Sequence, residues 1–310
     1  MLLIELMNGD TINRLLNVVL ALIMGGLGLS LTRDDFRHLY ARPRALSVGL
    51  AAQVLLLPLI AYALVQSGEI SPGLKVGIMI LSVCPGGITS NLISYFLKGN
   101  VALAISLTVA NAVLTLFSIP FLVNLFLIHF MQGGKEFQLP FWEVMYEITV
   151  VTVLPASLGL LLRSRLPALA KKIEKPMNLA STALLALVFM LKIFSKEDSG
   201  GAGLSWNDVV VLMPYVMLLN FLSMFGGFFA GTLFALPFKD KITISVEVGL
   251  HNTALALLIA GNILHNHEME KPALVYAISS FFITFAVAWL LGRINKAMIQ
   301  SKRKTDSGTR

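Results

Sequence analysis

Residues 77–99 read GIMILSVCPGGITSNLISYFLKG, and the centre of this stretch is Cys84-Pro85-Gly86-Gly87-Ile88-Thr89-Ser90-Asn91. The stretch begins as an apolar helix suited to lipid, but the proline removes a backbone donor and the paired glycines favour non-helical conformations. In hydrocarbon, such a break is tolerated only where protein or a watery cavity satisfies the freed peptide groups. Three oxygen-bearing side chains follow the break directly. The stretch therefore predicts a broken membrane helix with an ion or anion site.

The composition of the chain points to the lipid bilayer. Of its 310 residues, 56% are hydrophobic and 13% are charged, a balance that no water-soluble domain of this length could cover with a polar surface. In a membrane protein, the placement of basic residues matters more than the net charge of +7, so we expect no nucleic-acid partner. A single cysteine forbids an internal disulfide. We expect an all-α polytopic membrane protein.

Apolar runs predict the number of spans, since a helix needs about 20 residues to cross a bilayer. We count nine: 12–31, 45–66, 75–97, 101–130, 146–163, 177–195, 208–236, 244–264 and 273–292. Nine spans put the two termini on opposite sides of the membrane. Of the 24 Lys and Arg residues, 18 lie in segments on the side of the C-terminus. The positive-inside rule then predicts a cytoplasmic C-terminus and an outer N-terminus, in a plasma or bacterial inner membrane.

No soluble domain separates the spans, so we treat residues 1–310 as one transmembrane transporter unit. Residues 294–310 form a cytoplasmic basic tail, which we interpret as a topological anchor.

Glu247 is the second candidate site residue, because it lies four residues into an otherwise apolar span. An unpaired carboxylate at that depth costs about 3 kcal/mol on insertion scales, and a bound cation would offset the cost. The alternative is that Glu247 reaches the cytoplasmic interface near Lys241. His251 and Asn252 continue the polar face, and Gly249 makes a second helix break plausible.

Two interrupted polar spans, one in each half of the chain, indicate an inverted-repeat secondary transporter with its site near the bilayer midplane. Three further polar residues lie within spans. Gln53 is of the kind that usually makes an interhelical hydrogen bond, while Thr108 and Asn111 share one helical face. Threonines in membrane helices commonly bond the backbone carbonyl four residues earlier, which is the alternative to a ligand role for Thr108.

Three motifs, in order and spacing, resemble the bile acid:sodium symporter family. They are Ser82 to Asn91, Lys98-Gly99-Asn100-Val101-Ala102-Leu103, and Val246-Glu247-Val248-Gly249-Leu250-His251-Asn252. The chain is similar to nine-helix members and to the bacterial homologues. The resemblance implies a panel domain, 1–40 plus 141–200, and a core domain, 45–132 plus 205–293, in which two discontinuous helices cross. It also implies that access to the site alternates as one domain moves against the other.

The resemblance implies which residues bind sodium. A first site would comprise Ser90, Asn91, Thr108 and Glu247, all with the oxygen ligands that hard cations prefer. A further family position in this site, usually Ser, is Ala104. A second site would use Gln53, Glu247 and backbone carbonyls around Val248 and Leu250. Its remaining family position is Gln, but His251 stands there, and imidazole is a poor sodium ligand. The family thus implies one or two Na+ ions, with the second site, or proton coupling in its place, left open.

The resemblance also marks a substrate site at the crossing. Asn252 matches a family position close to the substrate carboxylate, and Thr89 follows the helix break formed by Pro85, Gly86 and Gly87. Ile88 replaces a family Thr, which removes a hydroxyl and adds bulk. Helix N-termini at the breaks favour an anion. We therefore expect a sodium-coupled importer of a small organic anion, a bile acid or a smaller carboxylate.

Other functions stay open at this point. A proton-coupled or uncoupled transporter or exporter of the same superfamily, for example for arsenite, has thin support in Cys84 alone. An intramembrane enzyme could use Glu247 and His251, four residues apart on one helical face, but no hydrolase motif accompanies them. A receptor is disfavoured by the lack of a soluble output domain. The sequence leaves the oligomeric state undetermined.

Overall fold

The computed structural model describes residues 9–32, 35, 42–131 and 139–307, and every regular element in this part of the chain is helical. The elements in chain order are α2 (Gly9–Ser30), α4 (Pro43–Ala51), η1 (Ala52–Leu56), α5 (Leu57–Gln66), α6 (Pro72–Val83), α7 (Ile88–Phe96), α8 (Val101–Met131), α9 (Phe141–Ile148), η3 (Thr149–Val153), α10 (Leu154–Arg165), α11 (Pro167–Phe194), η4 (Glu197–Ser199), α12 (Trp206–Leu233), α13 (Phe238–Gly249), α14 (Thr253–Leu257), η5 (Leu258–Ile263) and α15 (His267–Ser307).

Eight helical segments of the described chain are long and apolar enough to cross a membrane, and they coincide with eight of the nine predicted spans. The remaining predicted span, 75–97, consists of two short helices, α6 and α7, with no helix between Val83 and Ile88. The break predicted at the proline and glycines is therefore confirmed. The second predicted interruption is present as well, since α13 ends at Gly249 and α14 begins at Thr253.

Two helices extend beyond the spans predicted in them. The predicted spans that start near 177 and 273 belong to α11 and α15, which begin earlier and hold Pro176 and Pro272 in their interiors. Interior prolines are tolerated in membrane helices because neighbouring groups satisfy the freed carbonyls. The backbone of α15 also continues through most of the predicted basic tail, to Ser307.

Two π-helical turns, η1 and η3, each precede a proline by a few residues. Pro58 follows η1, and Pro155 follows η3. A proline has no N–H to donate to the carbonyl group one turn earlier, and its ring would clash with that carbonyl. A widened π-helical turn before the proline relieves the clash. Gln53 lies within η1, so its side chain projects from a locally widened part of the helix.

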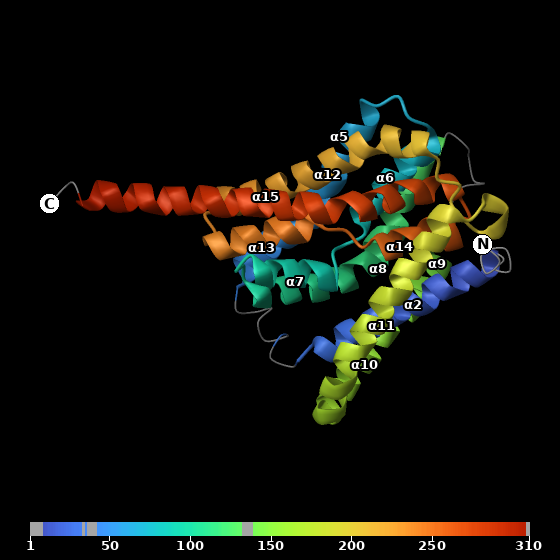
Figure 1. Cartoon of the computed structure of the whole chain (residues 1–310), viewed down its shortest axis with the longest axis horizontal. Helices are drawn as coiled ribbons and strands as arrows, with labels where there is room; N and C mark the ends of the chain where they lie inside the picture. The colour runs from blue at the N-terminus through green and yellow to red at the C-terminus, as the bar shows by residue number, and fades with distance from the viewer. Residues whose placement is uncertain (1–8, 33–34, 36–41, 132–138, 308–310) are drawn as a thin grey trace.

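The helices pack in two groups, which Figure 1 shows at an angle to each other. In the first group, α2 packs against α10 and α11. This contact is close because it is made by glycines: a Cβ atom on Gly28 would lie 2.0 Å from the carbonyl oxygen of Ala156. In the second group, α12 packs against α13 and α15, and α6 packs against α8 and α15. The two groups meet where α2 contacts η5 and α14, and where α8 contacts α9 and η3.

Candidate functional site

The two helix interruptions are in direct contact. The backbone N–H of Asn252 donates to the carbonyl oxygens of Cys84, at 3.3 Å, and Pro85, at 3.1 Å. On the other side of the contact, a Cβ atom on Gly86 would lie 2.9 Å from the carbonyl oxygen of Leu250. The carbonyl groups of the first interruption therefore accept a hydrogen bond from the second, and Gly86 of the first packs against a carbonyl group of the second. Freed peptide groups in a membrane need such protein partners.

Glu247 lies on α13 beside this crossing, with 1% of its surface exposed. The alternative interpretation required the side chain to reach the cytoplasmic interface. The side chain is buried in the protein instead. Within the described residues, neither oxygen of its carboxylate has a hydrogen-bond donor. An unpaired buried carboxylate is unfavourable, and a bound cation or a proton would compensate for it.

The predicted first-site residues are brought together around this carboxylate. The hydroxyl groups of Ser90 and Thr108 lie beside Glu247. The Ser90 hydroxyl donates to the carbonyl oxygen of Gly87 at 2.7 Å, and the shorter hydrogen bond of Thr108 goes to the carbonyl oxygen of Ala104 at 3.0 Å. Thr108 thus makes the bond to the carbonyl four residues earlier that is common for threonines in membrane helices, the alternative weighed against a ligand role. Thr108 Oγ1 also lies 3.3 Å from Asn91 Oδ1. The result is a cluster of hydroxyl and amide oxygens beside a buried carboxylate, an arrangement suited to a hard cation.

The break also frees a backbone carbonyl near Glu247. In a continuous helix, the N–H of Asn252 would donate to the carbonyl oxygen of Val248, but it donates to Cys84 and Pro85 instead. By contrast, the carbonyl oxygen of Gly249 is held by Asn220 Nδ2, at 2.7 Å, and by the Tyr276 hydroxyl. Sequence reasoning missed Asn220 and Tyr276, although an isolated Asn in an apolar span is a signal that could have identified one of them.

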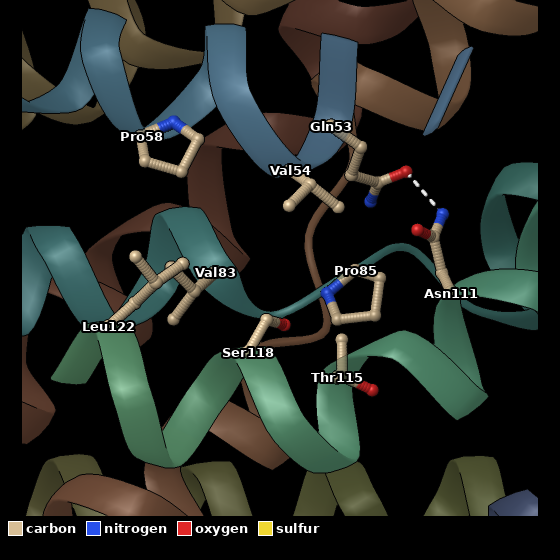
Figure 2. Close-up of a pocket in the computed structure, with 9 residues that line it drawn as sticks. All are labelled: Gln53, Val54, Pro58, Val83, Pro85, Asn111, Thr115, Ser118 and Leu122. Carbon is tan, nitrogen blue, oxygen red and sulfur yellow. Dashed lines mark hydrogen bonds between the residues drawn. The ribbon is translucent and has the colours of Figure 1, made fainter. Parts of the chain in front are cut away.

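Gln53 faces Asn111 across the helices, and its Oε1 atom accepts a hydrogen bond from Asn111 Nδ2 at 2.7 Å. Figure 2 shows this pair beside Pro85 at the rim of a small cavity, which Thr115 also lines. The cavity volume is about 10 Å³, which is close to the minimum for one water molecule. Gln53 therefore makes the interhelical hydrogen bond that is usual for a buried Gln.

His251 lies between the break and α15. Its Nδ1 atom is 3.3 Å from the carbonyl oxygen of Leu81, and its ring packs edge-on against Tyr276 with centroids 4.8 Å apart. Nε2 is buried and has no hydrogen-bond partner among the described residues. The position for which the resemblance implies a Gln oxygen thus holds an imidazole packed against an aromatic ring.

A larger cavity, of about 570 Å³, lies between the two helix groups. One wall comes from α2 and α11, and the other from α7, α14 and α15. Of the predicted site residues, Thr89, Ser90, Leu250, His251 and Asn252 line it. The side chain of Ile88 lies outside the described residues. Asn252 Oδ1 accepts a hydrogen bond from the N–H of Leu255 at 3.0 Å, so Asn252 caps α14 where that helix begins at the cavity.

The polar residues on the α11 wall of this cavity are Asn178, Ser181 and Thr182, and the apolar ones include Leu185 and Phe189. None of the described lining residues is a Lys, Arg, Asp or Glu. A ligand in this cavity would therefore meet hydroxyl and amide groups, helix termini and apolar surface, but no formal charge other than that of His251 when protonated.

Sequence reasoning also missed a buried ion pair. Lys192 Nζ lies 2.6 Å from Glu270 Oε1, and both side chains are fully buried. A lysine within the apolar run from Leu191 to Phe194 was the available signal, because charged residues inside a span usually have a partner and a function.

Several known proteins are similar to this chain in sequence. A model of the Sodium Bile acid symporter family matches residues 17–199, more than half of the chain. An uncharacterized sodium-dependent transporter, YocS of Bacillus subtilis, is 27% identical over 249 residues, covering 80% of this chain and 74% of that protein. The human ileal sodium/bile acid cotransporter is 24% identical over 290 residues, covering 90% and 80%. A probable sodium/metabolite cotransporter of rice chloroplasts, BASS2, is 26% identical over 264 residues, covering 85% and 60%.

Proposed function

The chain belongs to the sodium bile acid symporter family, and from this premise we propose that it imports an organic anion with sodium by alternating access. Membership makes it an integral membrane protein and a sodium-coupled solute symporter, not an enzyme. The proposal concerns the residues that bind sodium, the class of solute and the movement that carries both across the membrane.

Sodium binds at the first site, between Glu247, Ser90, Asn91 and Thr108. The observation that carries this assignment is the buried Glu247 carboxylate, whose two oxygens have no donor among the described residues. A cation at this point would offset the cost of burying the charge and would be coordinated by the carboxylate, the hydroxyl oxygens of Ser90 and Thr108 and the amide oxygen of Asn91.

One sodium ion is transported in each cycle. The second site would need Gln53, His251 and freed carbonyls such as that of Val248. Gln53 Oε1 accepts one hydrogen bond from Asn111, which leaves its second lone pair for a ligand, but the His251 ring offers nitrogen in place of oxygen. This loss of one oxygen ligand disfavours a second hard cation.

The solute is an organic anion, a bile acid or a smaller carboxylate. The N-termini of α7 and α14 border the cavity through Gly87, Thr89, Asn252 and Thr253, and helix N-termini favour anions. Apolar residues such as Leu185 and Phe189 would contact the organic part. The volume of about 570 Å³ lies within the usual range for small-molecule sites.

Transport occurs as a panel domain moves against a core domain. The panel is the group of α2, α10 and α11 with α9, and the core is an inverted-repeat unit that contains the crossing of α6–α7 with α13–α14. The cavity between the two groups is the solute path. We orient the N-terminus outside and the C-terminus in the cytoplasm of a plasma or bacterial inner membrane, on the distribution of basic residues.

Thermal unfolding of the purified protein in NaCl and in KCl at equal ionic strength tests the sodium site. The wild type is compared with Glu247→Gln, which keeps the shape of the side chain but removes the charge. At 100 times the dissociation constant, a ligand that binds only the folded state adds about 2.7 kcal/mol. We expect the wild type to be more stable in sodium than in potassium, and Glu247→Gln to show equal stability in both.

Glu268→Gln is the matched control, because Glu268 bonds Ser71 at 2.5 Å, well apart from this site. It should keep the sodium effect. Equal stability of the wild type in both salts would contradict the sodium assignment. Where the effect is present, sodium-driven uptake of bile acids and smaller carboxylates into proteoliposomes identifies the solute.

A further inference from the structure

The buried ion pair between Lys192 and Glu270 belongs to a polar cluster that the sodium and solute sites do not use. Lys192 Nζ donates to Glu270 Oε1 at 2.6 Å and to Asn13 Oδ1 at 3.0 Å. The second oxygen of Glu270 lies 3.3 Å from His267 Nδ1. Both oxygens of the carboxylate therefore have partners, unlike those of Glu247, and the lysine charge is compensated inside the protein.

This cluster joins the two helix groups. Asn13 and Lys192 belong to α2 and α11 of the panel, whereas Glu270 lies on α15 of the core. A second link runs parallel to the ion pair: Asn262 of η5 donates from Nδ2 to the carbonyl oxygen of Asn13 at 3.1 Å and to Asn17 Oδ1 at 2.5 Å. Every contact between these panel and core residues must break if the two groups slide past each other.

The cluster lies beyond one end of the large cavity. On α2, the cavity is lined by Ile23 and Met24, and the cluster residues Asn13 and Asn17 come earlier in the helix. On α11, Phe189 is the last lining residue, and Lys192 comes one turn later. On α15, the lining begins at Ala277, and Glu270 comes two turns before it. All three helices thus put the cluster past the same end, which is the outer end in the orientation proposed above.

The fit around Glu270 leaves little room for adjustment. A Cβ atom on Gly261, in η5, would lie 1.8 Å from Glu270 Oε1. The carboxylate is therefore held between Lys192 on one side and the backbone of η5 on the other. Buried charges in such a position are favourable when paired and strongly unfavourable when one partner is removed without access of water.

We propose that Lys192, Glu270, Asn13 and Asn262 form the outer gate of the transporter, an inference that rests on alternating access between panel and core. The gate has two stable arrangements. When it is closed, the charges pair in a dry interface and seal the outer end of the cavity. When it is open, water enters the cleft and hydrates both charges. Intermediate separations leave a charge neither paired nor hydrated, so the gate behaves as a two-state element.

Accessibility of a single cysteine from the outer side tests the gate. Phe189→Cys, in a Cys84→Ala background, puts a reporter thiol at the outer end of the cavity. A membrane-impermeant thiol reagent is added outside to proteoliposomes of one orientation, in sodium or in potassium. Lys192→Met and Glu270→Gln each remove one partner of the pair. We expect about tenfold faster labelling in both variants, equivalent to about 1.4 kcal/mol lost from the closed state.

Two matched controls remove similar charges near the gate. Lys196→Met removes an exposed lysine four residues from Lys192, and Glu268→Gln removes an acid that bonds within the core through Ser71. Both should label at the rate of the unmodified reporter protein. Labelling of the reporter protein could respond to sodium while Lys192→Met and Glu270→Gln leave its rate unchanged. That result would contradict the assignment of these residues to the gate but would leave alternating access intact. A reporter protein whose labelling never responds to sodium or solute would contradict alternating access itself.

A second test leaves the Lys192–Glu270 ion pair intact, so it holds even if the charge variants fail to fold. Asn17→Cys with Asn262→Cys, in the Cys84→Ala background, puts two thiols where the amide groups are hydrogen-bonded at 2.5 Å. Bridging them with Hg²⁺ should stop sodium-driven uptake, and a dithiol should restore it. Each single cysteine variant should be insensitive to Hg²⁺. Uptake that continues with the bridge formed would overturn the gate.

Discussion

The N–H of Asn252 donates to the carbonyl oxygen of Pro85 at 3.1 Å, so the start of one half-helix is tied to the break of another 167 residues away in sequence (252 minus 85). Glu247 lies five residues before Asn252 on the same interrupted segment. A cation at Glu247 would restrain the segment whose other end borders the solute cavity. Sodium and solute would then bind on opposite sides of one crossing. Their coupling therefore requires no long chain of residues between two distant sites.

Gly86→Ala tests this crossing. A Cβ atom on Gly86 would lie 2.9 Å from the carbonyl oxygen of Leu250 and 3.0 Å from Ser90 Oγ, so the two interruptions would have to separate. We expect Gly86→Ala to lose both sodium-dependent thermal stabilisation and uptake. Gly87→Ala is the matched control, because a Cβ atom there meets nothing within 4 Å, and it should keep the stabilisation by sodium. Equal sodium responses in the two variants would contradict a tight crossing.

Ala104→Ser should tighten sodium binding. Ala104 is fully buried, and its carbonyl oxygen accepts the hydrogen of the Thr108 hydroxyl. A hydroxyl added here supplies the oxygen ligand that the resemblance implies for this position, and one such interaction contributes roughly 1 kcal/mol, or about fivefold in affinity. The measurement is the sodium concentration that gives half of the thermal stabilisation. Ala102→Ser, on a different face of α8, should leave this concentration unchanged.

Features with a local cause could be predicted from the sequence. The break between α6 and α7 follows from Pro85 and the two glycines, because proline and glycine act on the backbone at their own position. The bond from Thr108 to the carbonyl oxygen of Ala104 is local as well. Prolines do not end a helix where neighbouring groups satisfy the freed carbonyls, and Pro176 and Pro272 accordingly lie inside α11 and α15.

Features that depend on distant partners could not be predicted. Lys192 and Glu270 are 78 residues apart, and Asn220 is 29 residues from the Gly249 carbonyl that it holds. A sequence marks each as a polar residue in an apolar run but does not say which partner it meets. The same limit applies to His251, since the packing of its ring against Tyr276 decides which atoms it offers to the site.

His251→Gln should add a second sodium ion. In the wild type, we expect a hyperbolic dependence of uptake on sodium concentration, because imidazole does not supply the missing oxygen ligand. Gln at this position restores an oxygen near the carbonyl that the break frees at Val248, and the dependence should become sigmoidal. His251→Leu is the control that removes the imidazole without adding oxygen, and it should stay hyperbolic. A wild type that is already sigmoidal would show that a second sodium binds despite His251.

Asn252 separates the solute site from the sodium site, because its side chain caps α14 at the cavity while its backbone holds the crossing. Asn252→Asp keeps an oxygen that can accept from the N–H of Leu255, so the cap, the fold and the stabilisation by sodium should persist. The added negative charge would repel an anionic solute at the helix N-terminus, and we expect sodium-driven uptake to fall by about tenfold or more, or about 1.4 kcal/mol.

Asn252→Ala, in contrast, loses the cap and should reduce stability by about 1 kcal/mol in either salt. Thermal unfolding and uptake of the same preparations distinguish the two effects. Full uptake by Asn252→Asp would mean that the solute is not an anion bound at this helix N-terminus.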